Sequence, residues 1–289
     1  MHSESIPSPA FDFTDESFDL LNSTSYHLSV IVDSSQFSFA VLDIKENKYL
    51  ALQSAITKEK FIQFLDKDKK DKQEIAVQAR PVWKSVTCSI VHNKFTLVPN
   101  SLFADENKRL LLEFNHPVAE DEKIHSDILR NLKARNLFSI SRKFESEIRN
   151  YFPQVHFIHS FTPFLEGLYI QNKNNAEKKV FANFHSDFFE VAILEGRNLL
   201  FSNAFCFKTP EEIAYYLLFV YEQLHLNPDT IELVLSGKID KAAQKHALLY
   251  TYIRHVRFQP LPENFRYSYK FEGLPAHKYF SLFTQYLCA

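Results

Sequence analysis

Apolar and polar positions along the chain spell a series of short strands and helices in an order that occurs twice. Three strand-like runs rich in Val, Ile, Phe and Tyr open the first half, at Tyr26–Asp33, Phe37–Asp43 and Lys48–Gln53. A helical pattern over Lys58–Leu65 follows and ends in a charged run, 66–72, which we expect to be a solvated loop. Ile75–Ala79 is expected to be a short fourth strand.

The second half follows the same order. Its first three strands are expected at Val180–Phe184, Phe188–Leu194 and Asn198–Phe205. A helix over Pro210–His225 comes next, with Thr209 as N-cap and Glu212 in the capping-box position. Ile231–Leu235 is the expected fourth strand. Each half closes with a helix, a strand and a second helix. In the first half they are expected at Ser141–Tyr151, Val155–His159 and Pro163–Gln171, the last interrupted late by Gly167. In the second half they are expected at Asp240–Tyr250, His255–Phe258 and His277–Leu287.

The two halves also match in sequence at an offset of 152 residues, the difference between positions 185 and 33. Val30–Asp33 lies over Ala182–His185, and Phe39–Asp43 lies over Val191–Glu195. A duplicated unit predicts two domains with the same architecture. The pattern predicts an α/β protein with two mixed-sheet domains, over residues 25–175 and 176–289, behind an acidic segment 1–24 that is either a mobile tail or a strap held to the surface by its aromatic rings.

The stretch from Pro81 to about Asn136 has no counterpart in the second half and is expected to be an inserted subdomain. It holds strand-like runs at 84–91 and 95–98, a helix Leu102–Phe114 with Ser101 as N-cap, and extended segments around 124–132. Aromatic and arginine anchors dominate binding energy at interfaces. The candidates for contact with a partner are therefore Trp83, Phe95, Phe103 and Arg109; the alternative is that Trp83 and Phe95 fill the small core of the insert.

Composition narrows the function by exclusion. The formal net charge is −2, so no general attraction to nucleic acid or to an anionic membrane is expected. The three cysteines are far apart and fit a reducing, cytoplasmic location, and no apolar run is long enough to span a bilayer. Only four glycines are present, whereas about twenty would be usual at this length. Phosphate-cradling loops need glycine, so few can exist here.

Several motifs resemble those of one bacterial family. They are Phe95–Pro99, Asn136–Phe138, His159–Thr162, Leu235–Gly237 and Tyr286–Cys288. The chain is similar from about residue 25 onward to the domain of unknown function 3822 family, found chiefly in Bacteroidetes and associated with an actin-like ATPase fold. The resemblance implies a duplicated fold of the actin, Hsp70 and sugar-kinase superfamily. It implies no activity, because the family has no established one.

In active members of that superfamily, a nucleotide sits between the halves, and two turns built on Asp followed by Gly and Thr or Ser grip its phosphates. The matching turns here are Asp33-Ser34-Ser35-Gln36, which lacks the glycine, and His185-Ser186-Asp187-Phe188, which lacks the leading Asp and the glycine. Thr162 stands where a carboxylate often precedes the proline of the connecting helix. The adenosine turn keeps one glycine, Gly237, followed by Lys238. These losses favour a fold that has given up the chemistry.

Two further groups of residues have competing interpretations. If Asp33, His185 and Asp187 face one another across the cleft, they could hold a divalent metal or act as an acid and base; the alternative is a set of solvated turn residues. A basic and aromatic stretch could stack on RNA bases, although core packing is the simpler interpretation; it comprises Arg254, Arg257, Arg266, Tyr252, Phe258, Phe265, Tyr267 and Tyr269.

The sequence therefore favours a non-catalytic binding or scaffold protein with a protein partner, no cofactor and no metal. The alternative is an atypical ATPase or kinase-like protein that binds ATP and Mg²⁺ weakly.

Overall fold

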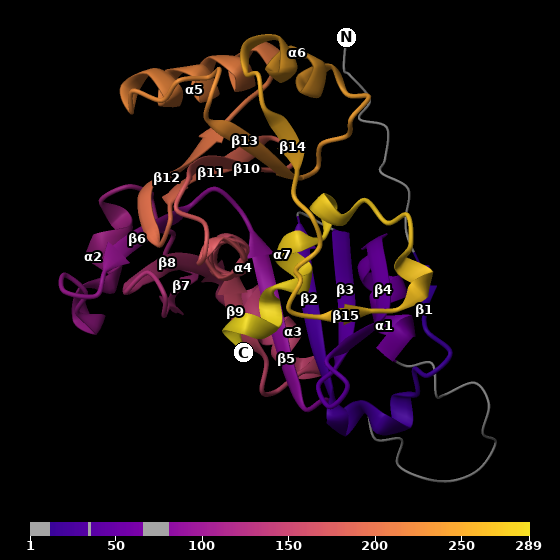
Figure 1. Cartoon of the computed structure of the whole chain (residues 1–289). Helices are drawn as coiled ribbons and strands as arrows, with labels where there is room; N and C mark the ends of the chain where they lie inside the picture. Colours follow the sequence, from indigo (N-terminus) through magenta and orange to yellow (C-terminus); the bar gives the residue numbers. More distant parts are fainter. Residues whose placement is uncertain (1–11, 34–35, 66–80) are drawn as a thin grey trace, which may run out of the picture.

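The structure is a computed structural model that describes residues 12–33, 36–65 and 81–289. The expected strand Ile75–Ala79, the charged run 66–72 and the turn residues Ser34 and Ser35 lie outside the described residues. Within the described ranges, three sheets of seven, five and three strands form the framework. Figure 1 shows the five-stranded sheet with its helices at the top, the seven-stranded sheet at the lower right and the three-stranded sheet at the left.

The seven-stranded sheet takes six strands from residues 12–159 and one, Arg266–Tyr267, from near the end of the chain. Its central strands have the expected positions: β2 (Tyr26–Asp33), β3 (Gln36–Asp43) and β4 (Lys48–Ile56), followed by α1 (Lys58–Leu65). β5 (Ser85–Val91) and β9 (His156–His159) add to β2 as parallel strands, giving the order β4-β3-β2-β5-β9. β5 thus fills the place of the fourth strand, so the assignment of this segment to the insert was wrong.

The five-stranded sheet repeats this order. β10 (Lys178–Phe184), β11 (Phe188–Glu195) and β12 (Asn198–Cys206) form the antiparallel part, and β13 (Glu232–Gly237) and β14 (Val256–Phe258) add in parallel. The order is β12-β11-β10-β13-β14. Because the connection from α1 to β5 is longer than its equivalent in the second half, the fixed offset that aligns the first strands does not carry over to the fourth.

Helices cover the outer face of the five-stranded sheet (Figure 1). α5 (Pro210–Gln223) begins as expected, since the Thr209 hydroxyl accepts from Glu212 N. The Glu212 carboxylate accepts from Lys208 N at 2.6 Å, one residue before the position expected of a capping box. The second helix on this face, α6 (Gln244–Tyr252), starts four residues later than predicted. In the first half, α3 (Arg142–Tyr151) is confirmed.

The small sheet belongs to the insert and has the order β6-β8-β7. Its strands are β6 (Phe95–Pro99), β7 (Glu122–Leu129) and β8 (Ala134–Ser141). β8 was not expected from the sequence, and the expected end of the insert, Asn136, lies inside it. The expected helix Leu102–Phe114 is shorter, with a 3₁₀ turn at Asp105–Asn107 and then α2 (Lys108–Glu113), whose N-cap is Asn107 rather than Ser101.

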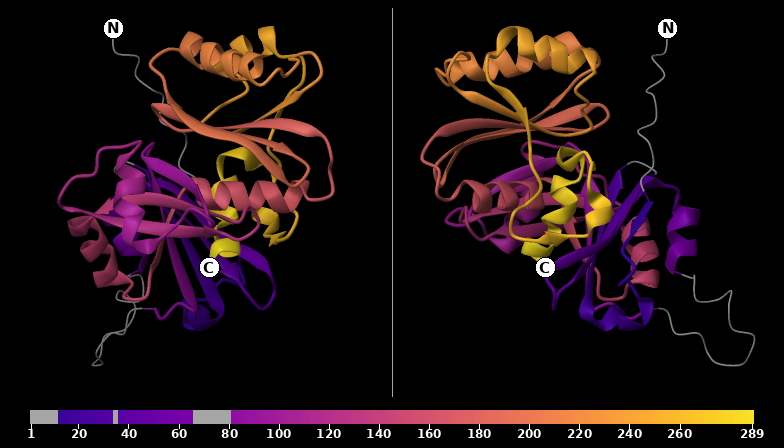
Figure 2. Two further views of the ribbon diagram at one scale, coloured as in Figure 1. Left: turned by 90° about the vertical axis from the view of Figure 1, so that its left-hand side faces the viewer. Right: turned by 45° about the vertical axis from the view of Figure 1, so that its right-hand side comes forward.

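Residues beyond β14 return to the first sheet, which corrects the expected limit of the second domain. β15 (Arg266–Tyr267) pairs with β4, and the predicted helix His277–Leu287 is broken into three pieces. The three pieces are the 3₁₀ helix Ala276–Lys278, α7 (Phe280–Phe283) and the 3₁₀ helix Gln285–Cys288. A further 3₁₀ helix, Tyr269–Phe271, precedes them. Both views in Figure 2 show this yellow segment lying between the two large sheets.

Residues 12–24 act as a strap on the same sheet. β1 (Asp12–Thr14) pairs antiparallel with β4, and a 3₁₀ helix at Leu20–Ser25 leads into β2. The Phe13 ring lies 6.0 Å from the ring of Phe271, and the buried Asp15 carboxylate binds Lys48 at 2.8 Å. For these residues, the strap is the correct alternative.

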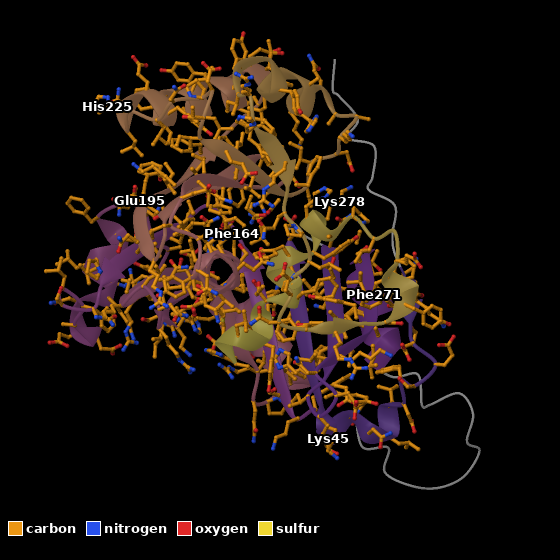
Figure 3. All side chains as sticks on the ribbon, in the orientation of Figure 1. Lys45, Phe164, Glu195, His225, Phe271 and Lys278 are labelled. Atoms are coloured by element: carbon orange, nitrogen blue, oxygen red, sulfur yellow. The ribbon has the colours of Figure 1, made fainter. Side chains whose placement is uncertain are left out.

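α4 (Phe161–Asn172) crosses the middle of the molecule, and its first eight residues are all buried. Figure 3 marks Phe164 of this helix at the centre, where its ring meets the edge of the Phe280 ring from α7. Gly167 does not interrupt the helix, because α4 continues to Asn172. A Cβ at this position would lie 2.5 Å from Thr284 Cγ2, so glycine lets the two helical segments touch.

We expect Gly167→Ala to lower the free energy of unfolding by about 1–3 kcal/mol, the usual range for overpacking, despite the better helix propensity of alanine. Thr284→Ser removes the methyl group that clashes and keeps the hydroxyl that bonds Phe280 O. The double variant should therefore recover part of the loss, as measured by urea unfolding. Equal losses in the single and double variants would contradict this packing.

Candidate functional site

The candidate site lies where β2, β10 and β13 end at the boundary between the two halves. Lys238, just after β13, places its ammonium 2.5 Å from Asp33 Oδ2 at the end of β2. The same ammonium donates to Ser186 Oγ at 3.0 Å, in the turn between β10 and β11. One lysine thus joins the two turns that, by resemblance, would face the phosphates of a nucleotide.

Gly237 fixes the backbone that carries this lysine. Its φ is +77°, and a Cβ there would come 2.2 Å from Phe184 O. The close approach lets Lys238 N donate to Phe184 O at 2.7 Å. This glycine therefore holds the turn against β10.

A second lysine lies behind the first. Lys245 of α6 donates to Lys238 O, and its ammonium lies 5.3 Å from the ring centre of Phe184 and 5.9 Å from that of Phe207. Burial lowers the pKa of Lys245 to about 8. Lys245 was not expected at the site, because a single lysine in a helical pattern gives no signal in the sequence.

His185 points into the protein rather than toward Asp33. Its Nε2 lies 3.0 Å from Glu190 Oε2, and the same oxygen accepts from Asn183 Nδ2 at 2.8 Å. The Phe188 ring stacks on the imidazole at 4.3 Å. Asp187 is exposed and shares none of these contacts. Within the described ranges, no three His, Cys, Asp or Glu side chains are placed to hold a metal ion.

Polar side chains form a row across the second sheet beside His185. Asn183 of β10 lies opposite Glu190 of β11 and Ser236 of β13, on the face turned toward α4. All three are buried, and Glu190 Oε1 and Ser236 Oγ have no hydrogen-bond partner among the described residues. Glu190 and Asn183 each interrupt an apolar strand, a signal that could have identified them from sequence.

Thr162 is buried at the start of α4, inside a network rather than in an open cleft. Its hydroxyl donates to Asp127 Oδ2 at 2.6 Å and accepts from Asn136 Nδ2 at 3.1 Å. His159 N donates to the same carboxylate oxygen at 2.8 Å. Burial raises the pKa of Asp127 to about 7. A carboxylate therefore does meet this helix start, but it comes from β7 of the insert.

The four candidates for partner contact differ in exposure. Trp83 and Phe95 are buried, but in the main core rather than in the small core of the insert that the alternative gave them. Phe103 is half-buried beneath the Arg135 guanidinium, 4.7 Å from the centre of its ring. Arg109 is exposed and pairs with Glu113. The most exposed apolar side chains of the insert are others: Leu102, Leu110 and Phe114.

Most of the basic and aromatic stretch is engaged in packing. Arg257 binds Glu232 at 2.6 Å, and the Phe258 ring lies 4.3 Å from that of His277. Tyr267 stacks on Tyr49 at 5.7 Å. Tyr252, Arg254 and Tyr269 remain exposed but belong to separate elements, so no continuous stacking platform is formed.

The sequence matches the family described as protein of unknown function (DUF3822) over residues 15–256. The chain belongs to this family. Among curated proteins, no sequence matches it. The expected fold is confirmed by a protein of unknown function with an actin-like ATPase fold from Bacteroides thetaiotaomicron VPI-5482, with a TM-score of 0.70 and 23% identity over 89% of this chain and 98% of that one.

A second similar structure is the PilM–PilN type IV pilus biogenesis complex. Its TM-score is 0.60 at 11% identity, over 90% of this chain and 97% of that one. At these identities the likeness shows the fold alone. In the part of the chain that the structure describes, we find no helix with the length and apolarity needed to cross a membrane.

We expect Asp33→Ala to lower the free energy of unfolding by about 1 kcal/mol or less, because its partner Lys238 is 42% exposed and such ion pairs are weak. Asp187→Ala, in the equivalent turn, is the matched control, and urea unfolding measures both. A loss of about 3 kcal/mol for Asp33→Ala would identify the carboxylate as a buried anchor instead.

Asp127 should make stability depend on pH in a direction unusual for a carboxylate. Its pKa is about 7 in the folded protein and near 3.8 when unfolded, so the folded protein keeps this proton up to a higher pH than the unfolded chain does. Its contribution to the free energy of unfolding should therefore fall between about pH 4 and 7, by roughly 2–4 kcal/mol.

Asp127→Asn should remove this fall, while the exposed Asp105→Asn should leave it unchanged. Urea unfolding of the wild type and both variants across this pH range measures the difference. Parallel pH profiles for the wild type and Asp127→Asn would show that the buried acid does not titrate in this way.

Proposed function

We propose that the chain is a non-catalytic binding or scaffold protein that retains an actin-like fold without nucleotide turnover. The observation that carries the proposal is the Lys238 ammonium between Asp33 and Ser186. By resemblance, this is the space between the two turns that hold phosphates in active members. A lysine paired with the carboxylate also competes with Mg²⁺ for the same oxygen atoms.

The neighbouring residues support the same conclusion. His185 is turned into the core, and the Phe188 ring lies against it. Thr162 is buried in the Asp127 network and offers no carboxylate of its own. Side chains at positions where active relatives keep glycine also restrict the backbone that would approach a phosphate.

A protein partner fits this proposal better than a small substrate. The PilM–PilN structure is a complex between two proteins, one of which shares this fold. The insert also exposes Leu102, Leu110 and Phe114, which are 70, 70 and 88% accessible. Leu110 lies on α2 and Phe114 directly follows it, so these two side chains are one helical turn apart, and exposed apolar groups of this kind are typical of contact surfaces.

We also propose that the chain arose by internal duplication and that it is a bacterial, cytoplasmic protein. The shared strand order of the two large sheets supports an internal duplication. Cys88, Cys206 and Cys288 are all free thiols, which supports a reducing compartment such as the bacterial cytoplasm.

The second candidate function is atypical nucleotide binding. The observation in its favour is Lys238 at the boundary between the halves, with Lys245 behind it; the Lys238 ammonium could face phosphate oxygens if the Asp33 ion pair opened. A nucleotide would then replace the carboxylate as the counter-ion of Lys238.

Millimolar ATP with Mg²⁺ should leave the melting temperature unchanged, since binding at 100 times the dissociation constant would add about 2.7 kcal/mol and shift it visibly. The measurement is differential scanning fluorimetry of the wild type and of Lys238→Ala, with Lys241→Ala as an exposed control. An upward shift in the wild type that is lost in Lys238→Ala alone would favour the nucleotide-binding alternative and overturn the proposal.

A further inference from the structure

β12 is the outer strand of the five-stranded sheet. In the described ranges no strand pairs with its free edge, so alternate backbone N–H and C=O groups point away from β11. Figure 1 shows β12 at the left edge of this sheet, above the small sheet of the insert. An open edge of this kind is a site where an extended peptide can add as a further strand.

A groove runs between this strand and the insert. One wall consists of β6 and the turn from β7 to β8, with Leu97 and Leu132, and the other consists of Asn198–Ser202 of β12. The register between β11 and β12 shifts after Ile193, which pairs with Phe201, while Leu194 pairs with Leu199. Leu200 is therefore the extra residue of a bulge, and its side chain, 43% exposed, lines the groove. Bulges re-aim side chains in this way.

The charged residues that line the groove are both cations, Lys133 and Arg197. Lys133 comes from the β7–β8 turn and Arg197 from the β11–β12 turn, so the two halves of the molecule each contribute one. Arg197 donates to Lys173 O at 3.5 Å, and neither cation forms an ion pair with another described residue. The groove thus combines leucine side chains with positive charge that the described protein does not neutralise.

We propose that this groove binds an extended segment of a partner protein in which apolar and acidic side chains alternate. Alternation follows from the strand geometry, because successive side chains point to opposite sides. Apolar side chains would pack on Leu132 and Leu200, and carboxylates would pair with Lys133 and Arg197. The inference rests on the proposed function as a protein-binding module and names the class of partner and its surface.

The apolar lining favours a peptide over a single-stranded nucleic acid. Binding of single strands relies on exposed aromatic faces on which bases stack. Phe201 is the one aromatic residue lining the groove, and it is half-buried. Leucine side chains beside a free strand edge suit an extended polypeptide instead.

The test is a selection of random 12-residue peptides displayed on phage against the full chain. Selected peptides should alternate apolar and acidic residues, and synthetic copies should bind in fluorescence anisotropy. Affinity should fall by about tenfold or more in the double variant Lys133→Glu/Arg197→Glu. It should change less than about twofold in the control Lys241→Glu/Arg254→Glu, which carries the same charge change on exposed residues elsewhere. Methylating alternate backbone nitrogens of the peptide should also abolish binding, because the added strand loses its donors.

Four results would overturn the inference: no enriched peptide, enriched peptides without acidic residues, equal binding to the double variant, or tighter binding of a 12-nucleotide RNA that depends on the same two cations. Thermal melts establish that both variants fold. The melting temperature measured with ATP and Mg²⁺ is independent of these results. The peptide-binding inference can therefore be overturned while the proposal of a non-catalytic protein stands.

Discussion

The structure depends on one helix that is buried on all sides. α4 packs against β9 and β7 of the first half, against β11 of the second and against α7, so each face of its first eight residues needs an apolar or internally bonded side chain. Phe161 and Phe164 join a single core that reaches Phe181 on β10. A helix that is apolar all round is stable only inside such a core. The two halves are therefore one packed body at this point, and relative motion between them is limited by α4.

This packing also determines which side chains lie at the boundary between the two halves. The face of the second sheet that meets α4 carries Glu190 and Asn183, buried where apolar side chains would be less costly. A buried polar atom without a partner lowers stability unless another interaction compensates. His185 supplies the compensation for one Glu190 oxygen. Near it, the ion pair between Lys238 and Asp33 joins the ends of β13 and β2 across the boundary between the halves.

Local patterns predicted the central strands and α5, because alternation and the Thr209 cap are encoded in neighbouring residues. Local patterns did not predict the elements whose place in the fold depends on residues far away in the sequence. β5 was assigned to the insert because its place in the sheet is set by pairing with β2. β8 was not predicted because it pairs with β6 and β7, and a short stretch of sequence does not reveal such pairing. Asp33 was found by resemblance. Its partner Lys238 follows only from the approach of β13 to β10.

The return of residues 259–289 to the first sheet has a consequence for biosynthesis. Gln285 donates to Val30 O and accepts from Thr87, and Tyr49 donates to Phe283 O, contacts that span up to 255 positions. At about 5–20 residues per second, the ribosome adds the last of these residues roughly 10–50 s after the strand they cover. During that interval the apolar face of β3 and β4, with Ala40, Leu42 and Leu52, still lacks the Phe271, Leu282 and Phe283 side chains that cover it in the finished protein.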